Sequence, residues 1–184
     1  MGLLDGLKSM FAGGRCDVAA RFEILREAIS GTMSDFYMAR DRKTDQVVGL
    51  KVLDAKKTAE FESRFKGLTK PTEGEIAVTF DHPYVVKTFE HGLTTRGQQY
   101  LVMEFLDGPG LNSLLIGRDA RLDGHRLDLI RQAASAIGAI HEAGYIHRDV
   151  CPRNFVVQAD GSGLKLIDFG LTVPATTPFM LPGN

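Results

Sequence analysis

The sequence has little cysteine, almost no net charge and no long apolar run. Its two cysteines, Cys16 and Cys151, are too few for a disulfide framework and lack the paired spacing of a zinc site. Lys and Arg total 22 against 23 Asp and Glu, so the overall charge gives no reason to expect a nucleic-acid partner. No apolar stretch reaches the roughly 18 residues that cross a membrane. We therefore expect a cytoplasmic protein with no nucleic-acid partner and no transmembrane segment.

Residues 1–17 are expected to form a tail or linker ahead of the folded part. They lack the basic segment and unbroken apolar core of a secretory signal, and Gly6 stands where a myristoylation pattern needs Ser or Thr. Apolar residues recur there at helical spacing, at Leu3, Leu4, Leu7, Met10 and Phe11. This spacing indicates a short helix that packs on the domain, and the alternative is a docking helix for a membrane surface or a partner protein.

The apolar patterning predicts an α+β fold in which a sheet-rich part precedes a helix-rich part. The expected strands are 22–28, 35–40, 47–53, 85–90 and 99–105, and a small hairpin pairs 155–157 with 164–167. Helical patterns cover 56–80, with an interruption near 67–71, and 123–143, where the apolar stripe is Leu127, Ile130, Ala134, Ile137 and Ile140. Pro71 suits the first turn of the second helical piece, and Gly144 suits the position after the long helix.

Two motifs late in the sequence carry the strongest functional signal. The run from His147 to Asn154 reads H-R-D-V-C-P-R-N, and Asp168-Phe169-Gly170 follows the predicted hairpin. Together they resemble the catalytic loop H-R-D-x-x-x-x-N and the D-F-G motif of protein kinases. The resemblance implies a protein-kinase-like bilobal fold. Residues 18–105 would form an N-lobe with an antiparallel sheet and helix C, and residues 106–184 a partial helical C-lobe.

The resemblance extends to a lysine and a glutamate upstream. The run V-G-L-K that ends at Lys51 is similar to the V-A-I-K strand, which implies that Lys51 holds the α- and β-phosphates of ATP. Glu73 is the implied partner of Lys51, and Glu75 is its rival. Four residues on, Glu73 leads to the apolar Ala77, whereas Glu75 leads to the polar Thr79. Because the inward face of this helix should be apolar, the pattern favours Glu73.

The resemblance also implies the catalytic roles. Asp149 would accept the proton of the attacking hydroxyl or orient that hydroxyl, and Asn154 and Asp168 would bind Mg²⁺. Lys51, Asp149, Asn154 and Asp168 are thus the implied catalytic residues. Arg148 would pair with a phosphorylated activation loop. The possible phosphorylation sites in that loop are Thr172, Thr176 and Thr177.

Further residues are implied to surround the nucleotide. By the resemblance, this group is Gly31, Phe36, Gly49, Lys51, Glu73, Met103, Glu104, Leu106 and Val156. Met103 would lie behind the adenine, and the main chain at Glu104 and Leu106 would hydrogen-bond the base.

The glycine-rich loop departs from the family pattern G-x-G-x-x-G-x-V. Ile29, Gly31 and Ser34 occupy the three glycine positions, and Phe36 occupies the Val position. We expect this loop to bind the phosphates of ATP more weakly, because glycines let the backbone approach phosphates closely. Gly49 replaces the alanine that lies over adenine, which is expected to lose some packing without changing the chemistry.

The catalytic loop and the end of the sequence depart as well. Cys151 replaces the lysine that neutralises the γ-phosphate in Ser/Thr kinases, and Arg153 is a candidate substitute, while Pro152 keeps the Ser/Thr pattern. No A-P-E motif follows Gly170 before Asn184, so the resemblance covers roughly the first two-thirds of a kinase domain. We expect a fragment of a longer protein or a natural truncation.

The implied activity is transfer of a phosphoryl group from ATP, with Mg²⁺, to Ser or Thr hydroxyls of a protein substrate. The retained Lys51, Asp149, Asn154 and Asp168 favour this enzyme. The alternative is an inactive pseudokinase that binds ATP as a scaffold, which the eroded glycine-rich loop and the altered catalytic loop favour. A third reading, a small-molecule kinase of related fold, is disfavoured by Arg148 and by the D-F-G motif.

Overall fold

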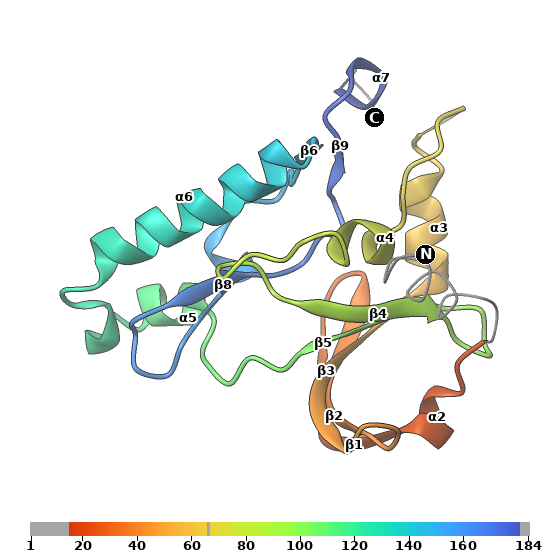
Figure 1. The fold of residues 1–184 in the computed structure, drawn as a ribbon, viewed down its shortest axis with the longest axis horizontal. Helices are drawn as coiled ribbons and strands as arrows, with labels where there is room; N and C mark the ends of the chain where they lie inside the picture. Colours follow the sequence, from red (N-terminus) through yellow and green to blue (C-terminus); the bar gives the residue numbers. More distant parts are fainter. Residues whose placement is uncertain (1–14, 66, 181–184) are drawn as a thin grey trace, which may run out of the picture.

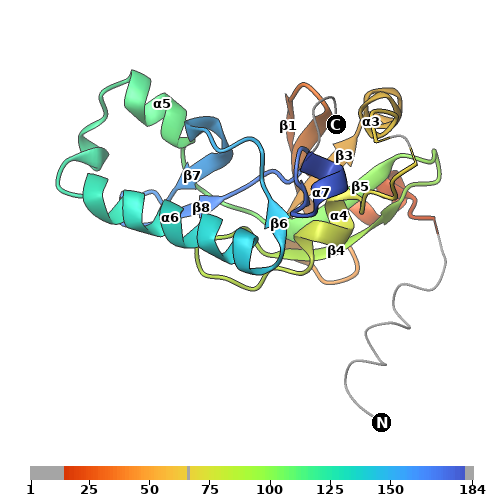
Figure 2. The same ribbon diagram turned by 90° about the horizontal axis from the view of Figure 1, so that it is seen from above.

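The computed structural model describes residues 15–65 and 67–180, which form a sheet-rich part and a helix-rich part (Figure 1). In Figure 2 the sheet, α3 and α4 occupy the right half of the view, and α5, α6 and the hairpin of β7 and β8 occupy the left half. The short helix predicted for residues 3–11 lies outside the described residues. Among those residues, no helix combines the length and apolar character needed to cross a membrane.

Five antiparallel strands form the larger sheet, in the order β1-β2-β3-β5-β4. Their bounds are Phe22–Ser30 for β1, Ser34–Asp41 for β2, Gln46–Leu53 for β3, Thr88–Leu93 for β4 and Gln99–Glu104 for β5. The inner strands β3 and β5 carry the longest runs of buried residues, as expected for strands covered on both faces. The antiparallel sheet of the predicted α+β fold is confirmed.

One predicted strand is wrong in its first half. Val85 forms a bridge with Leu166, and the N–H of Val86 donates to the Leu166 carbonyl at 2.9 Å. Both valines are buried, and β4 begins only at Thr88. The segment 85–90 therefore pairs with two partners in succession, first with β8 of the hairpin and then with β5 of the larger sheet.

The described helices beside the sheet are short: α2 (Val18–Arg21), α3 (Ala55–Glu62) and α4 (Glu73–Ala77). The predicted helical region 56–80 is thus two helices with a wider gap than expected. Thr72 and Glu75 form a capping box that fixes the start of α4. The placement of Pro71 within the first helical turn is therefore wrong, because Pro71 precedes the cap.

Within residues 106–180, the helix-rich part consists of short strands, 3₁₀ turns and helices. They are α5 (Leu111–Ile116), the 3₁₀ turn η1 (Ala120–Leu122), α6 (Arg126–Glu142), β6 (Tyr145–Ile146), η2 (Pro152–Asn154), β7 (Phe155–Val157), β8 (Leu164–Leu166), β9 (Val173–Pro174) and α7 (Thr177–Met180). The predicted hairpin is confirmed as β7 and β8. Gly144 follows α6 with a φ of 79°, the left-handed conformation expected at that position.

The apolar stripe predicted on α6 is only partly right. Leu127 and Ile130 are 59% and 65% exposed, whereas the buried face consists of Leu129, Ala136 and Ile140. Ile140 belongs to both the predicted stripe and the buried face, and Ile137 packs against the core, so the prediction holds only toward the C-terminal end of the helix. Helical spacing identifies an apolar face but not the neighbour that covers it.

The main hydrophobic core joins the two parts of the molecule. It contains Leu53, Leu101 and Met103 of the sheet, Ile76 and Ala77 of α4, Leu129, Ala136 and Ile140 of α6, and Phe155, Val157, Leu164, Leu166 and Phe169 around the hairpin. This shared core fixes the sheet relative to the loops that follow β6 and β8.

Candidate active site

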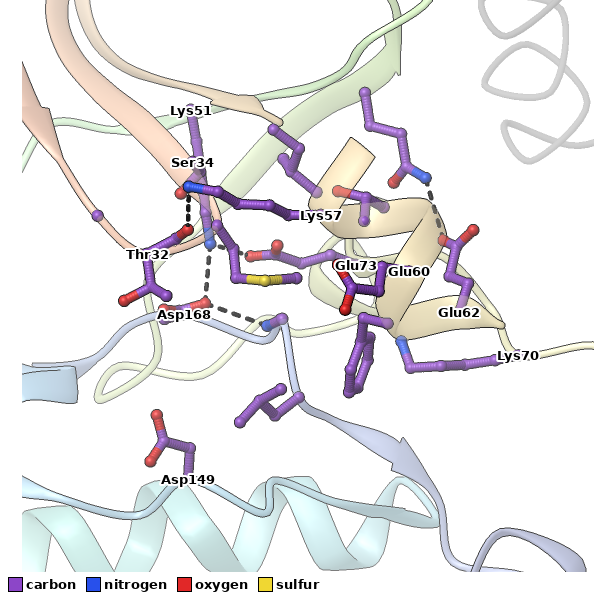
Figure 3. Close-up of a pocket in the computed structure, with 18 of the residues that line it drawn as sticks. Thr32, Ser34, Lys51, Lys57, Glu60, Glu62, Lys70, Glu73, Asp149 and Asp168 are labelled. Carbon is purple, nitrogen blue, oxygen red and sulfur yellow. Dashed lines mark hydrogen bonds and ion pairs between the residues drawn. The ribbon is translucent and has the colours of Figure 1, made fainter. Parts of the chain in front are cut away.

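Three charged side chains from distant parts of the chain meet beside β3. The ammonium of Lys51 lies 2.6 Å from Glu73 Oε1 on α4 and 2.8 Å from Asp168 Oδ1, which follows β8 (Figure 3). Lys51 and Glu73 are buried, whereas 45% of the Asp168 side chain is exposed. The structure thus places Glu73 against Lys51, while Glu75 belongs to the capping box.

Burial and charge set the protonation of this trio. Burial disfavours a charged Lys51, but the two carboxylates outweigh this and raise the pKa of Lys51. Burial also disfavours an ionised Asp168, yet the Lys51 ammonium and its hydrogen bond lower the pKa of Asp168 below its ordinary value. Burial raises the pKa of Glu73 more than Lys51 lowers it, and Asp168 adds to the rise. Near neutral pH, Lys51 is therefore protonated and Asp168 ionised.

The backbone around Asp168 holds its carboxylate in place. Asp168 adopts a φ of 66°, which is uncommon for a residue other than glycine, and its Oδ1 accepts the N–H of Gly170 at 3.1 Å. Phe169 is buried and stacks on Phe80 with ring centroids 5.2 Å apart, and its N–H donates to Glu73 Oε1 at 3.3 Å. The packed ring offsets the backbone strain and keeps Asp168 next to Lys51.

A second polar pair is built by the loop that contains η2. The side-chain amide of Asn154 donates to the main-chain carbonyl of Asp149 at 2.7 Å and to Asp149 Oδ2 at 2.9 Å. The N–H of Asp149 donates to Nδ1 of His147 at 3.3 Å. Burial lowers the pKa of His147, so its ring is neutral at pH 7 and can accept this bond. Asp149 is thereby fixed by neighbours on both sides.

These groups line one cavity of about 700 Å³, bounded by the β1–β2 turn, α3 and the loops after β6 and β8. The sequence-predicted residues that line it are Gly31, Lys51, Glu73, Asp149, Asn154 and Asp168. Arg153 lines it too. So do three cations that the sequence reasoning missed, Lys57, Arg64 and Lys70. No motif marks these three, because a lysine or arginine between a strand and a helix is ordinary surface composition.

Six residues predicted around the nucleotide do not line this cavity: Phe36, Gly49, Met103, Glu104, Leu106 and Val156. Three of them pack together on the sheet. A Cβ at Gly49 would lie 2.8 Å from the ring of Phe36 and 3.1 Å from Cγ of Met103. The expected loss of packing at Gly49 is therefore wrong, because the larger Phe36 fills the space.

The other three lie where the two parts of the chain join. Glu104 ends β5, and its carboxylate pairs with Lys165 of β8. Leu106 lies outside any strand, in the segment that leads to α5, and Val156 forms a bridge with Gly110.

The possible phosphorylation sites differ in exposure. Thr172 is fully buried and donates to the carbonyl of His147, so its candidacy as an exposed loop site is wrong. Thr176 and Thr177 are exposed. Burial of Thr172 follows from its position just before β9, which pairs with β6.

The oxygen atoms in the cavity suit a magnesium ion. The Asn154 amide nitrogen makes both of that side chain's hydrogen bonds, and Lys51 and Gly170 both contact Oδ1 of Asp168. In the described residues, Asn154 Oδ1 and Asp168 Oδ2 thus have no protein partner, and Mg²⁺ prefers such hard oxygens. No group of three His, Cys, Asp or Glu suited to a metal occurs within 15–65 and 67–180. An ion held by these two residues would complete its shell from phosphates and water.

Comparisons with known proteins agree on one family. A family model described as "Protein kinase domain" matches residues 22–178. Serine/threonine-protein kinase DBF20 of Saccharomyces cerevisiae is 33% identical over 150 residues, 82% of this chain and 26% of that protein. Serine/threonine-protein kinase PrkC of Bacillus subtilis is 30% identical over 156 residues, 84% of this chain and 23% of that protein. Serine/threonine-protein kinase PknA of Mycobacterium tuberculosis is 30% identical over 179 residues, 91% of this chain and 40% of that protein. The chain spans less than half the length of each.

Proposed function

The chain belongs to the protein kinase family, and we propose that its cavity binds ATP with Mg²⁺ and transfers the γ-phosphoryl group to Ser or Thr hydroxyls of a protein. One observation carries the proposal. Lys51 contacts both Glu73 and Asp168, and Asp149 and Asn154 line the same cavity. Phosphoryl transfer needs this combination of a phosphate-binding cation, metal ligands and a group that orients the nucleophile.

We assign nucleotide binding to the junction between an N-lobe of residues 18–105 and a partial C-lobe of residues 106–184. Lys51 would hold the α- and β-phosphates, oriented by Glu73. Phe36, Gly49 and Val156 would enclose the adenine, with Met103 behind it. The main chain at Glu104 and Leu106 would hydrogen-bond the base. The end of the sheet at Glu104 and the bridge between Val156 and Gly110 support this division.

Asn154 and Asp168 would hold Mg²⁺, which when bound neutralises charge on the phosphates and leaves the γ-phosphorus open to attack. The chain's own contribution is to keep both oxygen donors ready. The lowered pKa of Asp168 keeps its carboxylate ionised, and the two hydrogen bonds of the Asn154 amide turn its oxygen away from Asp149.

Asp149 would orient the substrate hydroxyl and take its proton. The hydroxyl oxygen forms a bond to the γ-phosphorus, the bond from that phosphorus to the β–γ bridging oxygen breaks, and ADP leaves. Asn154 fixes the Asp149 carboxylate through Oδ2, which leaves Oδ1 to face the hydroxyl; the thiol of Cys151, a weak donor, lies 3.7 Å from Oδ1.

Arg153 would supply the positive charge that Cys151 cannot. It lines the cavity with Asp149 and Asn154, and the proximity of Cys151 and Asp149 raises the pKa of Arg153, so it is always charged. If Arg153 neutralises the γ-phosphate, then Arg153→Met should lower kcat with little change in the affinity for ATP.

The alternative is an ATP-binding scaffold without transfer, which the eroded glycine-rich loop and Cys151 favour. The decisive experiment compares the purified protein with its Asp149→Asn variant in radiolabelled phosphate transfer to Ser and Thr peptides. We expect Asp149→Asn to lower kcat about a hundredfold or more and to leave Mg-ATP binding intact. Equal turnover by both proteins would refute the catalytic assignment, and Mg-ATP binding without any transfer would support the scaffold.

A cytoplasmic location accompanies this proposal. Cys16 and Cys151 are both free thiols, as expected in a reducing compartment with a supply of ATP. Fractionation of cells that express the tagged protein would test it, with recovery in a secreted or membrane fraction as the contrary result.

A further inference from the structure

We propose that Lys57 is a second phosphate-binding lysine of the cavity, an inference that rests on the proposed ATP-binding function. Lys57 lies in the first turn of α3, which begins at Ala55, directly after the strand that carries Lys51. Its side chain lines the same cavity as Lys51 and Asp168. Neither its position nor its residue type belongs to any motif in the sequence.

The Lys57 ammonium is held over the β1–β2 turn. Its Nζ donates to the carbonyl of Thr32 at 2.8 Å, and Figure 3 shows the side chain running from α3 toward Thr32 and Ser34. Asp54 supports this arrangement from both sides. Its carboxylate caps α3 by accepting the N–H of Lys57 at 2.9 Å, and its own N–H donates to the carbonyl of Met33 at 2.9 Å. The turn is thus tied to α3 at two points.

The β1–β2 turn does not offer all of its main-chain N–H groups to a phosphate. A phosphate-binding turn works through main-chain N–H groups that point at the anion. Here the N–H of Gly31 donates to the carbonyl of Ser34 at 2.8 Å, so it is engaged within the turn. Ile29 and Ser34 stand at the other two glycine positions of the family pattern, and residues other than glycine limit how closely the backbone can approach a phosphate. An ammonium has three N–H donors, and Lys57 engages one of them with Thr32.

The positive charge of Lys57 is less compensated by nearby carboxylates than that of Lys51. Lys51 lies between the carboxylates of Glu73 and Asp168, so one positive charge faces two negative ones. In the described part of the chain, Lys57 forms no ion pair with a carboxylate, and its hydrogen-bond partner is a neutral carbonyl. Its charge is therefore available to the phosphates at the exposed end of the cavity.

Three ligands separate a phosphate contact from a general effect on the fold. We would measure the binding of Mg-ATP, Mg-ADP and adenosine to the full chain by calorimetry, for the unsubstituted protein, Lys57→Met and Lys56→Met. Lys56 is the matched control, because it is the adjacent exposed lysine of α3 and does not line the cavity. We expect Lys57→Met to bind Mg-ATP about tenfold more weakly and adenosine equally well. Lys56→Met should change neither, and Lys57→Arg should retain most of the Mg-ATP affinity.

Each contrary outcome has a distinct meaning. If Lys57→Met and Lys56→Met bind Mg-ATP equally well, the role of Lys57 is refuted and the ATP site stands. If Lys57→Met loses affinity for adenosine and Mg-ATP alike, Lys57 acts through the packing of the turn, which also refutes a phosphate contact. If the unsubstituted chain binds adenosine and Mg-ATP equally weakly, the proposed function falls together with this inference.

Discussion

The ring of Phe36 occupies the space that a side chain at position 49 would need. The two positions lie on adjacent strands, and each departs from the family pattern in the opposite direction, one larger and one smaller. Met103 packs against the same space from β5. Positions 36, 49 and 103 therefore pack as one group beside the proposed adenine site. A substitution at one of them should change the effect of a substitution at another.

The residues at positions 36 and 49 should show strong coupling. Gly49→Ala alone is expected to lower the free energy of unfolding by about 1–3 kcal/mol, because its methyl group would overlap the ring of Phe36. In the double variant with Phe36→Val the overlap disappears, so the coupling energy should be about 1 kcal/mol or more. Denaturant unfolding of the four proteins measures it. Additive effects of the two substitutions would contradict this packing.

The charged trio makes a prediction about pH. Lys51→Met removes the cation between Glu73 and Asp168, and it should lower the free energy of unfolding by about 3–5 kcal/mol near neutral pH. Burial already raises the pKa of Glu73 above its ordinary value of 4.5, and without Lys51 the pKa of Glu73 rises further. Glu73 then takes up a proton as the pH falls toward 4.5, which relieves the buried negative charge.

The stability gap between Lys51→Met and the unsubstituted protein should therefore narrow as the pH falls from about 8 toward 5. Denaturant unfolding at a series of pH values measures this gap. The double variant Lys51→Met with Glu73→Gln is the control, because it lacks the carboxyl group of Glu73. The difference in free energy of unfolding between this variant and the unsubstituted protein should vary less with pH. A gap in Lys51→Met that stays constant over the whole range would contradict the account.

At the scale of elements, the short helix α4 depends on a glycine for its position. A Cβ at Gly74 would lie 2.4 Å from Cβ and 2.5 Å from Cγ of His91 on β4, so the helix sits in direct contact with the sheet. Glu73 is the residue before Gly74, and its carboxylate must reach Lys51. Any shift of α4 away from β4 would therefore disturb that ion pair.

Gly74→Ala is expected to lower the free energy of unfolding by about 1–3 kcal/mol and to weaken Mg-ATP binding. Gly138→Ala in α6 is the matched control, because a Cβ there meets nothing within 4 Å. That substitution should raise the free energy of unfolding by up to about 1 kcal/mol, since alanine is the better helix former. Thermal unfolding and calorimetry measure both effects, and a neutral or stabilising Gly74→Ala would disprove the close contact.

Much of the candidate site could be predicted from the sequence, because its chemistry fixes residue types at set spacings. Lys51, Asp149, Asn154 and Asp168 follow from motifs, and the structure brings all four to one cavity. Glu73 followed from a simple physical argument, that the residue one helical turn later should be apolar.

Other features could not be predicted, because they depend on which neighbour an element meets. The segment at Val85 pairs with β8 and not with the sheet, and α6 buries Leu129 rather than Leu127. The spacing of apolar residues along the sequence is the same whichever neighbour the segment packs against. Lys57 was missed for a related reason, since only the folded turn brings the carbonyl of Thr32 within reach of its ammonium.

The main hydrophobic core connects the sheet, α4, α6 and the hairpin. Ile140 lies in that core and is fully buried, whereas Ile130 on the same helix is 65% exposed. Ile140→Ala should lower the free energy of unfolding by about 2–5 kcal/mol. Ile130→Ala should change it by no more than about 0.5 kcal/mol. Thermal unfolding of the two variants distinguishes them, and equal effects would contradict the observed orientation of α6.

The dependence of ATP binding on Mg²⁺ tests the proposed metal-binding role of Asp168. Calorimetric titration of ATP into the chain, with and without Mg²⁺, would be compared for the unsubstituted protein and for Asp168→Asn. We expect Mg²⁺ to strengthen ATP binding to the unsubstituted protein and this gain to be largely lost in Asp168→Asn, because a neutral amide replaces the anionic ligand. An equal gain from Mg²⁺ in both proteins would contradict the claim that Asp168, held by Lys51, is the metal-binding carboxylate of this cavity.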